Sequence, residues 1–131
     1  MLPPASAIMS TALFIRDQDI VKQGYLLKQS KYLRQWKQRW IVLTNQYICS
    51  FESQGGHVGS APTEYLLLKD CTTVRSADDE TGRENSFKIE STDRTFFLIA
   101  SSMEEKESWI GVIGRQMIRP TVLIPGSGGS A

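Results

Sequence analysis

Cysteine, histidine and long hydrophobic runs are scarce in this chain of 131 residues. Its two cysteines, Cys49 and Cys71, form no C-x-x-C motif, and His57 is the single histidine. We therefore expect no zinc site, other metal site or disulfide scaffold, and interpret both cysteines as buried apolar side chains in a reducing compartment. No apolar run approaches the roughly 20 residues that a membrane-spanning helix requires.

Catalytic motifs are missing as well. The sequence contains neither G-x-S-x-G nor G-x-x-x-x-G-K-[ST], and no pair of carboxylates lies at expected strand ends. With one histidine, no nucleophile and base can be paired. We expect a protein that is not an enzyme and that needs no cofactor.

Acidic residues are missing from one long stretch of the chain. The whole sequence has 15 basic and 14 acidic residues, but positions 20–51 contain no acidic one. The basic residues of this stretch are Lys22, Lys28, Lys31, Arg34, Lys37 and Arg39. We expect one cationic patch on an otherwise acidic body, which would attract polyanions at one place.

The remaining composition is ordinary, with 40% hydrophobic and 22% charged residues, and predicts one globular domain. We place that domain at residues 20–119. Residues 1–19 are expected to form a flexible arm or a short helix. Residues 120–131, rich in glycine and serine toward their end, are expected to form a tail or linker.

Short segments rich in β-branched and aromatic residues alternate with turn-forming residues, which favours a mainly β fold. The expected strands are 22–29, 37–44, 47–53, 64–69, 71–76, 86–91 and 95–100. A helix follows, because Ser102 and Glu105 match a capping box and Trp109, Ile113 and Met117 share one face. The order predicts a seven-stranded antiparallel barrel or sandwich that one C-terminal helix closes.

The segment that joins the first two expected strands contains the candidate ligand-binding residues. Residues 28–40 read KQSKYLRQWKQRW. Lys28 shares the strand face of Leu26, and Lys37 and Arg39 share that of Ile41, so the three cations extend apolar rows toward one end. Converging cations suit a phosphate group, provided that no internal carboxylate neutralises them.

Two bulky residues, Tyr32 and Leu33, lie at the middle of the loop between these strands. Lys31 and Arg34 flank them, an arrangement typical of an anchor that enters the headgroup layer of a membrane. The alternative is a hairpin tip that folds back onto the barrel. The sequence leaves both open.

Residues 20–119 resemble a pleckstrin homology (PH) domain in three motifs, which are G-Y-L-L-K at 24–28, W-K-Q-R-W-I-V-L at 36–43 and the late Trp109. The resemblance implies two near-orthogonal antiparallel sheets, closed at one end by the helix and binding phosphoinositide headgroups at the other. It implies that Lys28 and Arg39 hold ring phosphates, that Lys37 supports them and that Tyr47 donates a hydrogen bond. The supporting cations would be Lys22, Lys31 and Arg34. A narrower resemblance is to the acylated PH proteins of apicomplexan parasites, which sense phosphatidic acid.

Together these features predict a peripheral module that recognises anionic phospholipids, phosphoinositide or phosphatidic acid, on the cytoplasmic leaflet. Its location would be cytoplasmic, with reversible attachment to the membrane surface. An adaptor of the same fold that binds a protein partner is the alternative. Single-stranded nucleic acid is the least favoured ligand, and no nucleic acid is expected, because the rest of the chain is acidic.

Overall fold

The computed structural model describes residues 15–118. Its strands are β1 (Lys22–Gln29), β2 (Trp36–Leu43), β3 (Tyr47–Phe51), β4 (Glu64–Leu67), β5 (Cys71–Ser76), β6 (Ser86–Ser91) and β7 (Thr95–Ile99). Its helices are the 3-10 turns η1 (Asp17–Asp19) and η2 (Leu68–Asp70), the short α2 (Asp78–Thr81) and the C-terminal α3 (Met103–Met117). The predicted fold class, seven antiparallel strands followed by one long helix, is confirmed.

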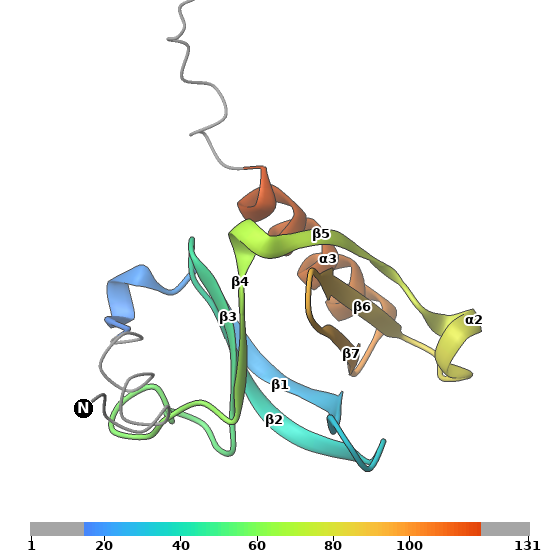
Figure 1. Cartoon of the computed structure of the whole chain (residues 1–131), viewed down its shortest axis with the longest axis horizontal. Coiled ribbons are helices and arrows are strands. Elements are labelled where there is room, and N and C mark those ends of the chain that lie inside the picture. Colours follow the sequence, from blue (N-terminus) through green and yellow to red (C-terminus); the bar gives the residue numbers. More distant parts are fainter. Residues whose placement is uncertain (1–14, 119–131) are drawn as a thin grey trace, which may run out of the picture.

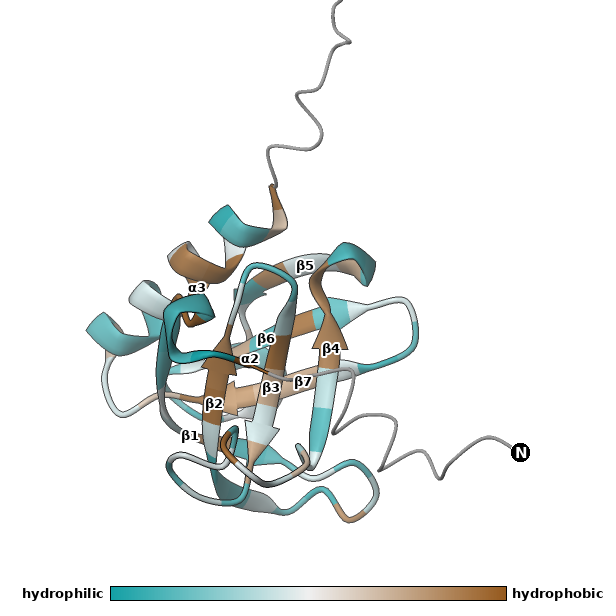
Figure 2. Cartoon of the chain, turned by 90° about the vertical axis from the view of Figure 1, so that its left-hand side faces the viewer, coloured by the Kyte–Doolittle hydropathy of each residue, from teal (hydrophilic) through white to brown (hydrophobic). Residues whose placement is uncertain are grey.

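All seven strands belong to one hydrogen-bonded sheet with the order β4-β3-β2-β1-β7-β6-β5. Only two residue pairs join β1 to β7, Leu27 with Ile99 and Lys28 with Leu98. The sheet bends at this narrow junction, so β5, β6 and β7 lie across β1–β4 (Figures 1 and 2). The two halves of the expected sandwich are therefore continuous through a short shared ladder.

The main hydrophobic core lies between the two halves of the sheet and α3. Leu26, Ile41 and Leu43 contribute from β1 and β2, and Trp109 of α3, 1% exposed, packs into the same cluster. The helix begins at the predicted cap, because the Ser102 hydroxyl accepts a hydrogen bond of 3.1 Å from the backbone nitrogen of Glu105. The expected capping box is only half formed, since the Glu105 side chain pairs with Lys22 rather than with the Ser102 backbone nitrogen. This packing closes one end of the fold.

A second, smaller cluster covers the outer face of β2 and β3. It contains Val42, Cys49 and Phe51, and Ile15 from the segment before β1 packs on them. Burial raises the pKa of the Cys49 thiol to about 12, so it behaves as an apolar side chain at neutral pH. Cys71, beside the main core, has a pKa of about 11, raised by burial and by the nearby Asp70.

Within residues 15–118, no helix is long and apolar enough to cross a bilayer. The same part of the chain contains no cluster of histidine, cysteine and carboxylate side chains that could hold a metal ion. Of the expected N-terminal arm, 1–19, the structure describes residues 15–19, which contain η1, whereas residues 1–14 and the expected tail, 120–131, lie outside the described part of the chain.

Candidate functional site

The backbone register of β1 and β2 brings the predicted cations together. Lys28 lies directly opposite Lys37, and Leu26 lies opposite Arg39. Side chains opposite one another share a face of the sheet, so these cations continue the apolar row that includes Ile41. Like charges directly opposite each other are unfavourable. The sequence therefore brings cations together where they repel each other in the absence of an anion.

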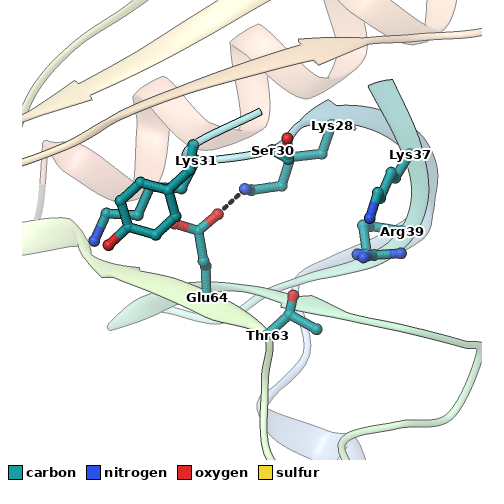
Figure 3. A pocket seen from close by; sticks show the side chains of 8 residues that line it. Lys28, Ser30, Lys31, Lys37, Arg39, Thr63 and Glu64 are labelled. Carbon is teal, nitrogen blue, oxygen red and sulfur yellow. Dashed lines mark hydrogen bonds and ion pairs between the residues drawn. The ribbon is translucent and has the colours of Figure 1, made fainter. Parts of the chain in front are cut away.

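A pocket of about 370 Å³ lies at this end of the sheet. Its walls come from β1, β2, the loop between them and the start of β4 (Figure 3). The lining residues are Lys28, Ser30, Lys31, Tyr32, Lys37, Arg39, Thr63 and Glu64. We call it the cationic pocket. Its volume falls within the range usual for small-ligand sites.

The loop above the pocket is closed at its base by two hydrogen bonds. The Ser30 backbone nitrogen donates to the Gln35 carbonyl oxygen at 2.7 Å, and the Gln35 nitrogen donates to the Ser30 hydroxyl at 3.0 Å. This closure holds Lys31 and Tyr32 over the strand ends, and the Lys31 ammonium lies 5.4 Å from the centre of the Tyr32 ring. The base of the loop is therefore held in place by these hydrogen bonds, and the loop forms one wall of the pocket.

One carboxylate lies inside the cationic pocket, contrary to the sequence-based expectation. The Lys28 ammonium donates to Oε1 of Glu64, as the dashed line in Figure 3 marks. Arg94, from the turn between β6 and β7, donates to the same carboxylate from Nε to Oε2 at 2.8 Å and from Nη2 to Oε1 at 2.9 Å. Glu64 thus links β4 to β1 and to the turn between β6 and β7, neither of which is a ladder neighbour of β4.

Burial determines the electrostatics of this cluster. Lys28 is only 4% exposed, and loss of water lowers the pKa of its ammonium although Glu64 opposes the shift. Loss of water alone would raise the pKa of Glu64, but the hydrogen bonds from Arg94 and Lys28 outweigh it and leave that pKa below its usual value. Glu64 is therefore a carboxylate at neutral pH.

Three cations of the pocket keep no carboxylate partner among residues 15–118. Lys31, Lys37 and Arg39 take part in none of the ion pairs of this part of the chain. The Arg39 guanidinium makes a hydrogen bond of 3.1 Å to the neighbouring carbonyl oxygen of Gln38. Because Glu64 is shared by two cations, the pocket as a whole remains strongly positive.

The tip of the loop projects apolar surface. Tyr32 is 83% exposed and Leu33 is 68% exposed. Arg34 follows with a φ of 54°, in the left-handed region, and does not line the pocket. The alternative of a tip folded back onto the barrel is wrong in this structure, because both bulky side chains face solvent. Arg34 belongs to the cationic loop but not to the pocket wall.

Two predicted site residues lie elsewhere, and both expectations are wrong. Lys22 begins β1 at the end opposite Lys28, pairs with Glu105 of α3 at 3.8 Å and lies 5.0 Å from the centre of the Trp109 ring. Tyr47 begins β3, next to the turn that follows β2, and packs on the outer face in the cluster with Val42. It lies at the wrong end of the strand and on the wrong face to contact a ligand in the cationic pocket.

Sequence reasoning missed Glu64, Arg94, Ser30 and Thr63. Glu64 and Arg94 are 30 residues apart in the chain, and no local pattern links them. Ser30 offered a weak signal, since a serine next to a strand end commonly caps a turn. Thr63 donates its hydroxyl to the Ser50 carbonyl oxygen at 3.0 Å, which fixes the start of β4 beside β3.

Residues 20–117 match the family model of the PH domain. The chain belongs to the PH domain family. PH domains are generally binding modules without catalytic activity. Among curated relatives, the chain is 36% identical over 100 residues to pleckstrin homology domain-containing protein 1 of Arabidopsis thaliana, with 75% of this chain and 69% of that protein covered. It is 33% identical over 95 residues to switch-associated protein 70 of Bos taurus, with 72% of this chain but only 16% of that protein covered.

Solved PH domains have the same fold. The C-terminal PH domain of pleckstrin, crystallised in complex with D-myo-Ins(1,2,3,5,6)P5, superposes with a TM-score of 0.64 at 32% identity, covering 75% of this chain and 95% of that one. A PH domain solved in solution superposes with a TM-score of 0.67 at 24% identity, covering 88% of this chain and 97% of that one, which supports the fold alone. The comparisons give no support to the narrower resemblance to acylated apicomplexan proteins.

Proposed function

We propose that this PH domain is a peripheral membrane module that binds an anionic phospholipid headgroup, phosphoinositide or phosphatidic acid, in the cationic pocket. The observation that carries the proposal is the group formed by Lys31, Lys37 and Arg39, which lines one pocket without a carboxylate partner among the described residues. Charge-assisted hydrogen bonds to phosphate are among the strong ones. Lys28 forms the floor of the pocket. Because Lys28 and Arg94 share the single carboxylate of Glu64, these three side chains together keep a positive charge.

The magnitudes favour reversible attachment. A basic residue near an anionic leaflet contributes about 1 kcal/mol, so three such residues give only weak recruitment without a specific headgroup contact. Salt shortens the range of this attraction to roughly 8 Å at physiological ionic strength. Membrane binding should therefore depend on both salt and headgroup, and we place the module at the anionic cytoplasmic leaflet.

The position of the loop tip agrees with this orientation. Tyr32 and Leu33 are exposed next to the pocket, so they reach the interfacial layer when the pocket faces a bilayer. Figure 1 shows the β1–β2 hairpin extending at the end of the fold that α3 leaves uncovered. The related pleckstrin domain was crystallised with an inositol pentakisphosphate, which supports a phosphorylated ring as ligand.

The test replaces the arginine of the pocket. Arg39→Ala should reduce cosedimentation with vesicles that contain phosphoinositide by at least tenfold, because it removes the bidentate donor from the pocket. Arg115→Ala is the matched control, since Arg115 is an exposed arginine of α3 outside the pocket. Circular dichroism of both variants should remain that of the wild type.

If Arg39→Ala bound vesicles as well as the wild type does, the cationic pocket would not be the lipid-binding site. A wild-type protein that stays in the supernatant with every anionic lipid would favour the adaptor alternative, in which the fold binds a protein partner.

A further inference from the structure

The carboxylate inside the cationic pocket has a consequence for the ligand. Glu64 occupies the side of the pocket where Lys28 lies, and its two oxygens already accept three hydrogen bonds, one from Lys28 and two from Arg94. A carboxylate has about four acceptor sites. One acceptor site therefore remains, and it can take a hydroxyl hydrogen but not a phosphate oxygen.

The opposite side of the pocket offers hydrogen-bond donors and positive charge instead of a carboxylate. Lys37 and Arg39 of β2 offer donors without a carboxylate partner, and in Figure 3 they stand on the other side of Lys28 from Glu64. A phosphate is attracted there, whereas the carboxylate of Glu64 repels it at close range. Lys31, which has no carboxylate partner among the described residues, lines the pocket from the loop, so the preference for a neutral hydrogen-bond donor is confined to the immediate surroundings of Glu64.

We propose that Glu64 is a specificity-determining residue, which selects headgroups that place a phosphate against Lys37 and Arg39 and a hydroxyl group against its own carboxylate. The ligand class is a polyol phosphate of low phosphate number, of the inositol type. A ring with phosphates all around it must bring one of them close to Glu64. The proposal rests on the proposed function, because it concerns the same pocket.

Displacement of Glu64 by a phosphate is the competing possibility, and the contacts disfavour it. The carboxylate is held by two hydrogen bonds from one arginine, an arrangement with a fixed geometry. Lys28 is 4% exposed, lies 4.3 Å from the centre of the Phe96 ring and pairs in the ladder with Leu98. A phosphate that replaced Glu64 at this ammonium would leave Arg94 without its carboxylate partner.

The experiment measures calorimetric affinities of two soluble probes, inositol 1,4-bisphosphate, which keeps four hydroxyl groups, and inositol hexakisphosphate, which has none. For the wild type we expect the hexakisphosphate to bind no more than about threefold tighter than the bisphosphate. Glu64→Gln keeps the shape of the side chain and removes its charge. It should raise the affinity for the hexakisphosphate about tenfold and change that for the bisphosphate less than twofold.

The matched control is Glu52→Gln, which removes one negative charge from an exposed residue outside the pocket. It should change both affinities by less than twofold. The same measurements with vesicles that carry phosphatidylinositol 4-phosphate separate a lipid headgroup from a free inositol phosphate. Tighter binding to the vesicle than to the soluble bisphosphate identifies the lipid as the ligand, and equal binding identifies the free phosphate.

The outcomes separate this inference from the proposed function. If neither wild type nor Glu64→Gln binds any probe or vesicle, the proposed function fails and this inference with it. If the wild type binds but Glu64→Gln gains equally for both probes, or loses both, Glu64 has no selective role. Should the variant not fold, a wild-type preference for the hexakisphosphate above about tenfold is enough to overturn the inference.

Discussion

The cations of the cationic pocket differ in their carboxylate partners from the cations at the end of this PH domain that α3 closes, which we call the helix end. At the helix end, Lys22 pairs with Glu105 at 3.8 Å and Lys106 with Asp78 at 2.9 Å. In the pocket, Lys28 pairs with Glu64, but Lys31, Lys37 and Arg39 have no carboxylate partner in the described part of the chain. The comparison separates charges that hold elements of the fold together from charges that remain available to a ligand.

The aromatic residues follow the same division. Trp109 at the helix end is 1% exposed, whereas Tyr32 at the pocket is 83% exposed. Trp109 contributes to stability through buried apolar area, whereas Tyr32 leaves its apolar area in water. Residues that stabilise the fold and residues that bind the ligand are therefore expected to respond to mutation through different measurements.

The largest expected effect tests this contrast of aromatic residues. Trp109→Ala should lower the free energy of unfolding by about 3–5 kcal/mol, because it leaves a cavity in the main core. Tyr32→Ala should change it by less than about 0.5 kcal/mol and should weaken vesicle binding instead. Urea unfolding and cosedimentation measure the two properties. Comparable losses of stability in both variants would contradict the division.

A pair of lysine substitutions sharpens the contrast of charges. Lys106→Met removes donors to Asp78 at 2.9 Å and to the Ser76 hydroxyl at 2.7 Å, and should cost about 1 kcal/mol of unfolding free energy. Lys37→Met should leave stability unchanged or slightly raised, since Lys37 lies opposite Lys28. Its vesicle binding should fall about fivefold.

Thermal unfolding and cosedimentation of both methionine variants check this prediction. A destabilised Lys37→Met protein would show that the pocket cations support the fold. Undisturbed vesicle binding by Lys37→Met would show that its charge is not part of the site.

The smallest expected effect concerns the loop tip. Leu33 is 68% exposed and does not line the pocket. Leu33→Ala should weaken vesicle binding about threefold, through the apolar area it no longer inserts, without changing the affinity for a soluble inositol phosphate. Cosedimentation beside calorimetry makes the comparison. Equal losses in both assays would assign Leu33 to headgroup binding and reject an anchor.

The sequence alone was sufficient to predict where the strands lie and on which face of the sheet the cations of β1 and β2 lie. Alternation along the expected strands 22–29 and 37–44 places Lys28, Lys37 and Arg39 on the face of Leu26, as the register shows, although β2 itself begins and ends one residue earlier. Lys22 was grouped with the other cations because it belongs to the same basic stretch, although the expected strand 22–29 already places it at the end away from the loop. Six residues at about 3.3 Å each place it roughly 20 Å from Lys28.

Two further features depended on the three-dimensional arrangement. Tyr47 follows the turn after β2, so antiparallel pairing carries it away from the pocket, and its register places it on the outer face. Glu64 reaches Lys28 only because the sheet bends and brings β4 and the β6–β7 turn to the same end. Figure 2 shows β4 hydrophilic at its start and hydrophobic further along, and its local pattern contains no trace of the ion pair.

The most direct test of the division between the two ends is a nuclear magnetic resonance titration of the 15N-labelled chain with inositol 1,4-bisphosphate. The account predicts that amide shifts change most between Ser30 and Arg39 and at Thr63 and Glu64, with little change at Lys22, Lys106 or elsewhere in α3. The largest changes at α3 or on the outer face of β3 would contradict it.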